Sequence, residues 1–220
     1  KDPEPQTVMG FLNEMEFRTL TKRVAERLKI DAPEMDGAKG MHVEGAHDDA
    51  PAVQQLPFDH AAYECIRDRA ALDRWITRIQ AVGHVAVDTE TTSLDEMRAE
   101  LVGISLCVDA GTAAYIPLGH KQGGGDLFGS LALVEGQIGL DEALAALKPV
   151  LEDPAVLKIG QNMKYDWKIF ARHGIDIAPF DDTMLLSYAQ HAGLHGHGMD
   201  ALSDSYLGHV PIPIKSLLGS

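Results

Sequence analysis

The sequence predicts an α/β fold in which a mixed β-sheet is flanked by helices, preceded by an N-terminal helix and a linker. Two observations carry this prediction. Three strands are expected first, at residues 84–88, 101–108 and 112–118, and the short turn between the last two makes them antiparallel neighbours. Helices then alternate with a buried strand at residues 156–159, an order typical of sheets that carry helices on their faces.

The N-terminal part predicts one helix and a linker. Apolar residues recur at close to helical spacing between Val8 and Leu28, which predicts a helix there. Residues 31–58 are rich in Pro, Gly, Ala and Asp without periodicity, which is typical of a flexible linker. We therefore expect three parts: residues 1–30, the linker at 31–58, and a compact domain at 59–220.

The compact domain is expected to begin with a short strand at residues 63–66. An amphipathic helix follows, with Leu72, Trp75, Ile76 and Ile79 on one face. Further helices are predicted at residues 141–151, 162–173 and 200–208, and from the N-cap Asp182 through residue 190. The glycine-rich segment at residues 121–129 predicts a mobile loop.

Composition limits the class of protein. The net charge of −14 argues against a DNA-reading protein with a basic surface, but not against a nuclease that reaches phosphates through metals on clustered carboxylates. No apolar stretch approaches the roughly 20 residues of a membrane span, and no signal peptide opens the chain. Cys65 and Cys107 lie far apart in apolar runs, which favours reduced, buried thiols in a cytoplasmic protein over a disulfide.

The stretch at residues 84–94 carries the first candidate site. Its apolar run predicts a strand buried on both faces, and Asp88 and Glu90, two residues apart, point to the same side of that strand. Two like charges about 4 Å apart repel by about 4 kcal/mol at an effective dielectric near 20. Divalent Mg²⁺ or Mn²⁺ is the usual cation for all-oxygen ligands. An exposed turn in which both acids are solvated remains an equal alternative from this pair alone.

A second stretch, at residues 158–170, adds a third carboxylate. A buried strand runs through Gly160 into a helix, and Asn162 and Asp166 are expected to share one face near its first turn. A second metal would need such a carboxylate. The alternative is an acid that only compensates the helix dipole.

Four segments in order carry a family resemblance: Val-Asp-Thr-Glu-Thr, Leu-Lys-Ile-Gly-Gln-Asn-Met-Lys-Tyr-Asp, Phe-Asp-Asp-Thr-Met-Leu and Gly-His-Gly-Met-Asp-Ala-Leu-Ser. Over residues 63–219 the chain closely resembles the proofreading 3'-5' exonuclease domain of bacterial DNA polymerase I, a family A polymerase. That domain belongs to a superfamily with three Asp and one Glu on a ribonuclease H-like fold. The helix around residues 11–18 resembles the end of the preceding 5'-nuclease region, so both chain ends are expected to be cuts through a longer polypeptide.

The resemblance implies roles for matching positions. Asp88, Glu90 and Asp166 would be the catalytic metal ligands. Leu94 would wedge against the terminal base, and further substrate contacts would come from Thr89, Asn162, Tyr165 and Met199. Asp182 aligns with a frequent acid of the family, although a helix N-cap explains it equally well.

The implied reaction is two-metal hydrolysis of the 3'-terminal phosphodiester by Mg²⁺ or Mn²⁺, which releases a nucleoside 5'-monophosphate. Its expected partners are the single-stranded 3' end of DNA and the remaining domains of the parent polymerase, with no membrane. Two other functions stay open: an RNA exonuclease of the ribonuclease D type, and a catalytically silent scaffold domain.

One family feature is missing. No Tyr is followed four residues later by Asp anywhere in the chain, so the family's third motif is expected beyond Ser220, and the chain alone is expected to be weakly active or inactive. A sister class uses His-x4-Asp, a spacing that His195 and Asp200 fit. His191, His195 and His197 also raise the possibility of zinc, but no cysteine or acid completes a usual ligand set nearby, so exposed loop histidines are favoured.

Overall fold

The computed structural model describes residues 4–15, 17–30, 59–122, 132–193, 195–213 and 216. The chain divides into two compact units, Lys1–Pro51 and Ala52–Ser220. The predicted linker at 31–58 and most of the predicted loop at 121–129 lie outside the described residues.

The N-terminal unit contains two helices where the sequence predicted one. Helices α1 (Pro5–Glu14) and α2 (Arg18–Leu28) pack against each other. The chain turns between them, where Phe17 leaves helical geometry with a ψ of 61°. Each short helix buries one face on the other through Met9, Leu12, Thr21 and Ala25. The single-helix prediction was wrong because continuous helical spacing does not reveal a turn.

The larger unit contains a six-stranded mixed sheet in the order β1-β4-β3-β2-β5-β6. The strands are β1 (Glu64–Cys65), β2 (His84–Thr91), β3 (Leu101–Asp109), β4 (Thr112–Pro117), β5 (Leu157–Gly160) and β6 (Phe180–Asp182). β3 pairs antiparallel with β2 and β4, and the other neighbours are parallel. The predicted mixed sheet is confirmed. Strand β6 was not predicted, because it is an edge strand of three residues with an exposed Phe180 and has no apolar pattern that marks it.

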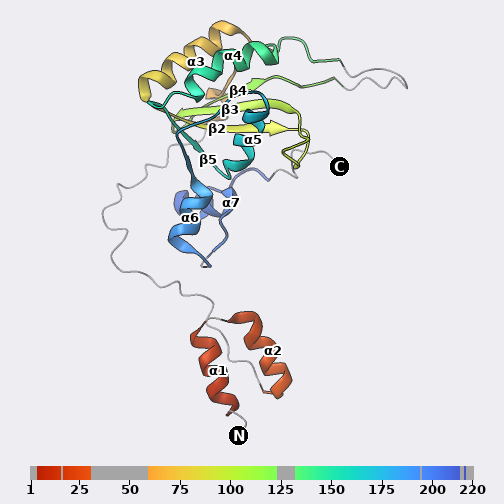
Figure 1. Cartoon of the computed structure of the whole chain (residues 1–220), viewed down its shortest axis with the longest axis vertical. Coiled ribbons are helices and arrows are strands. Elements are labelled where there is room, and N and C mark those ends of the chain that lie inside the picture. Colours follow the sequence, from red (N-terminus) through yellow and green to blue (C-terminus); the bar gives the residue numbers. More distant parts are fainter. Residues whose placement is uncertain are drawn as a thin grey trace, which may run out of the picture. The chain divides into compact units, whose positions relative to one another are not determined.

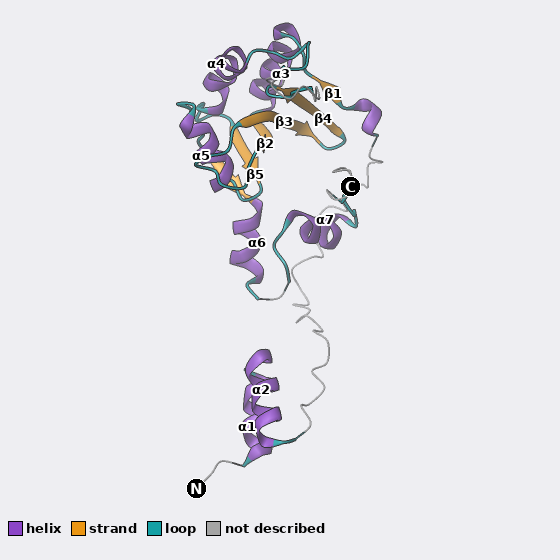
Figure 2. Cartoon of the chain, turned by 90° about the vertical axis from the view of Figure 1, so that its right-hand side faces the viewer, coloured by secondary structure: helices purple, strands orange, loops and turns teal. Residues whose placement is uncertain are grey.

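Helices cover the sheet on both sides. A short 3-10 turn, η1 (His60–Ala62), precedes β1. Helices α3 (Arg69–Val82) and α4 (Leu140–Leu151) lie together over one face, while α6 (Thr183–His191) and α7 (Met199–Leu207) lie on the opposite side (Figure 1). Helix α5 (Lys164–Arg172) contacts β2, and its position beside the sheet is visible in Figure 2. All the predicted helices of this unit are present within about two residues of their expected ends.

The core lies between the sheet and helices α3 and α4. Leu72, Trp75 and Ile79 of α3 are buried there, as predicted, and the Asp68 side chain caps α3 by accepting a hydrogen bond from the Ala71 amide. The charged side chain of Lys158 is buried as well. Lys158 of β5 donates from Nζ to the carbonyls of Asp153, Val156 and Ala178, so its ammonium group is fully paired.

Strand β2 is buried on one face only. Val85, Val87 and Thr89 are buried, whereas Ala86 and Asp88 on the opposite face are half-buried. The predicted burial on both faces was wrong, because α6 and α7 cover the second face incompletely and leave a cavity there. The opening keeps Asp88 accessible.

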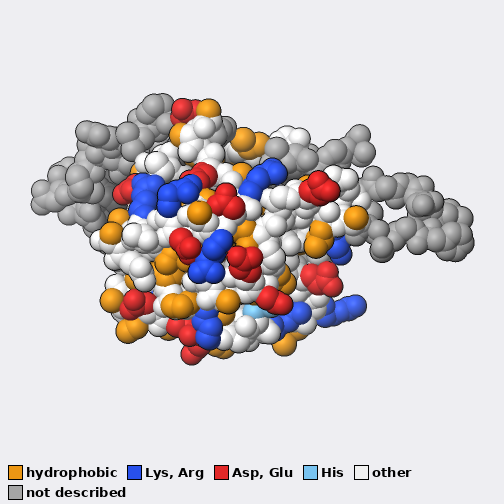
Figure 3. Space-filling model, turned by 90° about the horizontal axis from the view of Figure 1, so that it is seen from above, with side chains coloured by type: hydrophobic (Ala, Val, Ile, Leu, Met, Phe, Trp, Pro, Cys, Tyr) orange, Lys and Arg blue, Asp and Glu red, His pale blue; other side chains and the backbone are white. Residues whose placement is uncertain are grey.

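The surface of this unit shows no single-sign patch over the face seen from above, where acidic and basic side chains are interspersed (Figure 3). Surface ion pairs of this unit include Arg69–Asp73 and Arg78–Asp109. Both cysteines are free thiols. Cys65 is exposed on the edge strand β1 and Cys107 is half-buried, so the predicted burial of both thiols was wrong. No helix among the described residues is long and apolar enough to cross a membrane.

Candidate active site

Strand β2 carries the first two predicted acids. Asp88 is half-buried, Glu90 is exposed, and both lie on the same face of the strand, with Thr89 on the other. The strand continues to Thr91, so both acids lie within it and not beyond its end. A register shift between Glu90 and Thr91 bends the strand immediately after the pair.

The third predicted acid, Asp166, lies in the first turn of α5 and is only 2% exposed. Its Oδ1 accepts two hydrogen bonds from Thr89, one from the amide at 2.9 Å and one from the side-chain hydroxyl at 2.5 Å. An acid that merely compensated the helix dipole would not need this burial. The two stretches singled out in the sequence therefore meet at Thr89 and Asp166.

The charges of Asp166 and Glu90 act on Asp88. The pKa of Asp88 is raised from 3.8 to about 6, chiefly by burial and in addition by the nearby charges of Asp166 and Glu90. Burial also raises the pKa of Asp166, although the hydrogen bonds from Thr89 oppose this effect. The ionised form of Asp88 is therefore disfavoured, and a bound cation would stabilise it.

The carboxylates do not form a ready ligand set. Among the described residues, no three His, Cys, Asp or Glu side chains are placed so that they could hold a metal ion. Asp166 is hydrogen-bonded to Thr89, whose side chain lies on the face of β2 opposite to Asp88 and Glu90. The like charges of the three carboxylates also repel one another. Their convergence on one metal site therefore stays a prediction.

Asp182 organises the start of α5. Its side chain caps α6 through the amides of Met184 and Leu185, which confirms the predicted N-cap. The same carboxylate accepts hydrogen bonds from the amides of Asn162 (3.1 Å) and Met163 (2.9 Å). Four main-chain donors therefore meet one buried side chain.

Asn162 lies before helix α5 and not within it. Its φ of 59° places it in the left-handed region, and α5 begins only at Lys164. The expectation that Asn162 and Asp166 share a helix face was wrong, because the bonds to Asp182 hold a turn at residues 162–163. Asn162 remains exposed beside the site.

The turn that follows β2 carries Leu94 and is contacted by Tyr165. The Leu94 side chain is 95% exposed. The Tyr165 hydroxyl donates to the Ser93 carbonyl at 2.5 Å and shares a second hydrogen bond with the Thr91 hydroxyl. Tyr165 thus contacts the turn that carries Leu94 and not open solvent alone.

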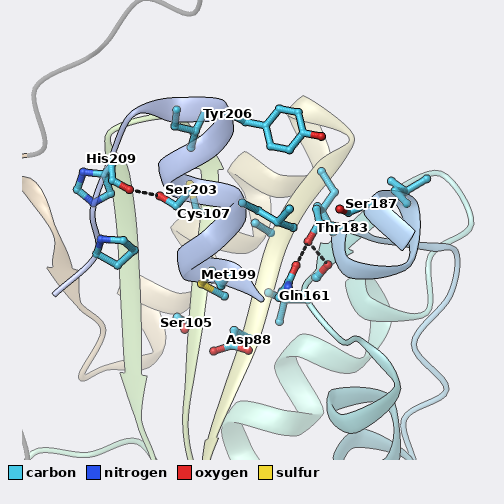
Figure 4. Close-up of a pocket in the computed structure, with 18 of the residues that line it drawn as sticks. Asp88, Ser105, Cys107, Gln161, Thr183, Ser187, Met199, Ser203, Tyr206 and His209 are labelled. Carbon is cyan, nitrogen blue, oxygen red and sulfur yellow. Dashed lines mark hydrogen bonds between the residues drawn. The ribbon is translucent and has the colours of Figure 1, made fainter. Parts of the chain in front are cut away.

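A cavity of about 760 Å³ opens between the sheet and helices α6 and α7. Asp88 of β2 and Met199 of α7 both line it (Figure 4), together with mainly apolar side chains such as Leu106, Ile159, Leu186 and Leu202. Of the predicted substrate contacts, Met199 lines this cavity, whereas Thr89, Leu94, Asn162 and Tyr165 do not.

Tyr115 is a neighbour of the site that the sequence analysis missed. Burial raises its pKa to about 12, and the charge of Glu90 contributes to the increase. Gly103, paired with Glu90 across the sheet, makes room for the ring, since a Cβ there would lie 1.9 Å from the Tyr115 hydroxyl. That hydroxyl forms a 2.7 Å hydrogen bond with His120. Sequence spacing gave no signal, because the pairing of β3 with β4 creates this contact.

The comparison with known proteins decides the family. A family described as 3'-5' exonuclease matches residues 63–219. The chain belongs to this 3'-5' exonuclease family. Similar proteins include DNA polymerase I of Rhizobium leguminosarum, 43% identical over 99% of this chain and 27% of that protein, and DNA polymerase I of Pseudomonas aeruginosa, 34% identical over 99% of this chain and 22% of that protein. The chain spans about a quarter of the length of these relatives.

Solved structures support the fold of this exonuclease domain. Escherichia coli RNase D, an exoribonuclease involved in structured RNA processing, superposes with a TM-score of 0.53 at 21% identity over 70% of this chain and 36% of that chain. The EXO domain of Aedes aegypti Nibbler gives a TM-score of 0.51 at 14% identity, covering 70% of this chain and 72% of the other. The predicted ribonuclease H-like architecture and family are confirmed.

The alternative sites built on histidine gain no support from the exonuclease domain's structure. His195 and Asp200 do not line the cavity that Asp88 lines. His197 is only 8% exposed, so its predicted exposure was wrong: its ring stacks on Tyr188 and its Nδ1 hydrogen-bonds Ser187 at 2.7 Å. These contacts give His197 a structural role between α6 and α7.

Proposed function

We propose that this exonuclease domain removes nucleotides from the single-stranded 3' end of DNA and thereby proofreads for a longer DNA polymerase. The observation that carries the proposal is the pair of hydrogen bonds by which Thr89, between Asp88 and Glu90 on β2, holds the buried Asp166 of α5, so that the charges of Asp166 and Glu90 act on Asp88. Clustered carboxylates suit phosphate chemistry only when a cation offsets their charge.

The donor set fits Mg²⁺ or Mn²⁺. Asp88, Glu90 and Asp166 offer only carboxylate oxygens, which these hard cations prefer. Burial and repulsion by the neighbouring carboxylates raise the pKa of Asp88, and a bound cation would stabilise its ionised form. Divalent cations in such sites supply a hydroxide nucleophile near neutral pH and offset negative charge on the phosphate. These three residues would hold them.

The chain's own residues would position the substrate. Thr89 fixes Asp166 through two hydrogen bonds, so this carboxylate is oriented before DNA arrives. Exposed Leu94 can separate the last base from its partner, and exposed Asn162 and half-buried Tyr165 can contact the frayed strand. The apolar wall that includes Met199 can take the base by stacking and van der Waals contact without reading its identity. The product would be a nucleoside 5'-monophosphate.

The test is Mn²⁺-dependent stepwise shortening of a 5'-labelled single-stranded DNA from its 3' end, with an RNA of equal sequence as the comparison. Asp166→Asn should abolish this shortening, because it removes the charge that Thr89 orients, whereas Asp181→Asn, which changes an exposed acid on β6, should not. Internal cleavage, or hydrolysis that persists in EDTA, would contradict the proposal.

The same assay separates the two alternatives. Faster hydrolysis of RNA than of DNA would favour an RNA exonuclease. Absence of hydrolysis, both by this chain and by one extended through the next Tyr-x3-Asp, would favour a catalytically silent scaffold. The burial and hydrogen bonding of Asp166 argue against a decayed site, because an unused buried carboxylate destabilises the fold.

A further inference from the structure

The turn between β2 and β3 is held in place by one face of helix α5. This turn, residues 92–100, carries Leu94 at 95% exposure and Met97 at 62% exposure. Its base is closed by hydrogen bonds between Thr92 and Glu100, from the Thr92 amide to the Glu100 carbonyl (3.0 Å) and from the Glu100 amide to the Thr92 hydroxyl (2.9 Å). The turn therefore projects from the sheet as a closed unit with an apolar tip.

Three residues of α5 reach the turn, at spacing that puts them on one side of the helix. Tyr165 donates to the Ser93 carbonyl at 2.5 Å. Lys168 forms an ion pair with Glu96 in which both side chains are about 30% exposed. Arg172 donates from one guanidinium nitrogen to the carbonyls of Glu96 (2.9 Å) and Ala99 (2.5 Å).

Among these three residues, Arg172 alone donates hydrogen bonds to two main-chain carbonyls of the turn. It satisfies two main-chain carbonyls at the far side of the turn, and guanidinium geometry suits such paired acceptors better than the point charge of a lysine. Asp166 lies in the first turn of the same helix. Helix α5 therefore connects the position of the exposed Leu94 with that of the predicted catalytic acid.

We infer that Arg172, assisted by Lys168, is a positioning residue that fixes the Leu94 turn relative to the active site and thereby sets how well the domain attacks paired 3' ends. The inference rests on the proposed function. A single-stranded end needs no separation from a partner, so its hydrolysis depends little on the turn. A paired end must be frayed, and only a turn held rigidly can keep Leu94 against the base pair.

The test is a double-mutant cycle on Mn²⁺-dependent hydrolysis of one 3' sequence, presented single-stranded and in a duplex. Arg172→Ala should lower the duplex-to-single-strand rate ratio about tenfold, the size expected when hydrogen bonds to a charged group are lost. Arg172→Lys should recover part of the ratio. In a Leu94→Ala background, Arg172→Ala should change the ratio little, because it acts through Leu94.

Arg78→Ala is the matched control. Arg78 also donates hydrogen bonds to two partners, Asp109 of β3 and Thr112 of β4, and both lie away from the turn. Equal losses on both substrates in Arg172→Ala, or an undiminished effect in the Leu94→Ala background, would overturn the inference.

Amide exchange gives a readout that does not depend on catalysis. In Arg172→Ala, exchange of amides protected within the turn, such as those of Arg98 and Ala99, should accelerate at least tenfold, while α3 stays unchanged. Unchanged exchange would refute the anchoring. If neither the unmodified chain nor one extended through the next Tyr-x3-Asp hydrolyses either substrate, the proposed function fails, and exchange alone decides whether Arg172 holds the turn.

Discussion

Replacing Asp88 with asparagine should stabilise the exonuclease domain in the absence of metal. Burial and two neighbouring carboxylates raise the pKa of Asp88 from 3.8 to about 6. A tenfold change in an acid constant is worth about 1.4 kcal/mol, so ionised Asp88 destabilises the folded state by roughly 3 kcal/mol at pH 8. Asparagine has nearly the same shape without the charge, and an imperfect hydrogen bond should cost it about 1 kcal/mol. We expect a net gain of about 2 kcal/mol.

The pH dependence has a definite sign. Because the folded state binds the Asp88 proton more tightly than the unfolded state, the stability of the unmodified chain should fall as pH rises between about 4 and 6 and this contribution should be level above. The electrostatic part of the advantage of Asp88→Asn should therefore shrink below about 1 kcal/mol at pH 4.

Urea unfolding followed by tryptophan fluorescence measures this. Both tryptophans, Trp75 and Trp167, lie in the larger unit, so the signal reports that unit. EDTA removes divalent ions, and Asp181→Asn serves as a control for loss of one exposed charge. Equal stabilities of Asp88→Asn and the unmodified chain at pH 8, or an advantage that does not depend on pH, would refute the reasoning. Added Mn²⁺ should stabilise the unmodified chain more than Asp88→Asn, since only the former retains the ligand.

Two further predictions concern support of the site and its completeness. Asp182→Ala should destabilise the domain by about 2–4 kcal/mol in the same urea assay, because four main-chain amides lose a buried acceptor. Asp68→Ala, which removes an N-cap that accepts one hydrogen bond, should cost about 1 kcal/mol. Similar costs for the two variants would contradict a special role for Asp182. A chain extended through the next Tyr-x3-Asp should hydrolyse a single-stranded 3' end about 10²–10³-fold faster than this one. Equal rates would mean that the site is complete within 220 residues.

The sequence predicted the larger unit well because its elements are bounded by local signals. Asp68 and Asp182 begin helices as N-caps, and Gly83, Gly174 and Gly208 follow helices with positive φ. The N-terminal helices were merged, by contrast, because the turn near Phe17 contains neither Gly nor Pro to mark it. Local sequence patterns therefore reveal the end of a helix only where that end requires a residue such as Gly, Pro or an N-cap.

The site was predictable as a set of residues but not as an arrangement. Spacing on β2 placed Asp88 and Glu90 on one face, as observed. The partners of Asp166 could not be foreseen, since Thr89 is 77 residues away and the contact depends on how α5 packs on β2. Tyr115 escaped notice for the same reason, because strand pairing alone brings it beside Glu90.

The hydrogen bonds between the motifs explain why they depend on one another. Thr89 of the first motif binds Asp166 of the second, and Asp182 of the third segment binds the amides of Asn162 and Met163 that precede α5. Tyr165 returns to the turn after β2. Helix α5 is therefore fixed at its start by β6 and along its side by the end of β2, so a shift of either strand would move Asp166. A carboxylate held in this way keeps its position while Asp88, destabilised when ionised, provides the attraction for a cation.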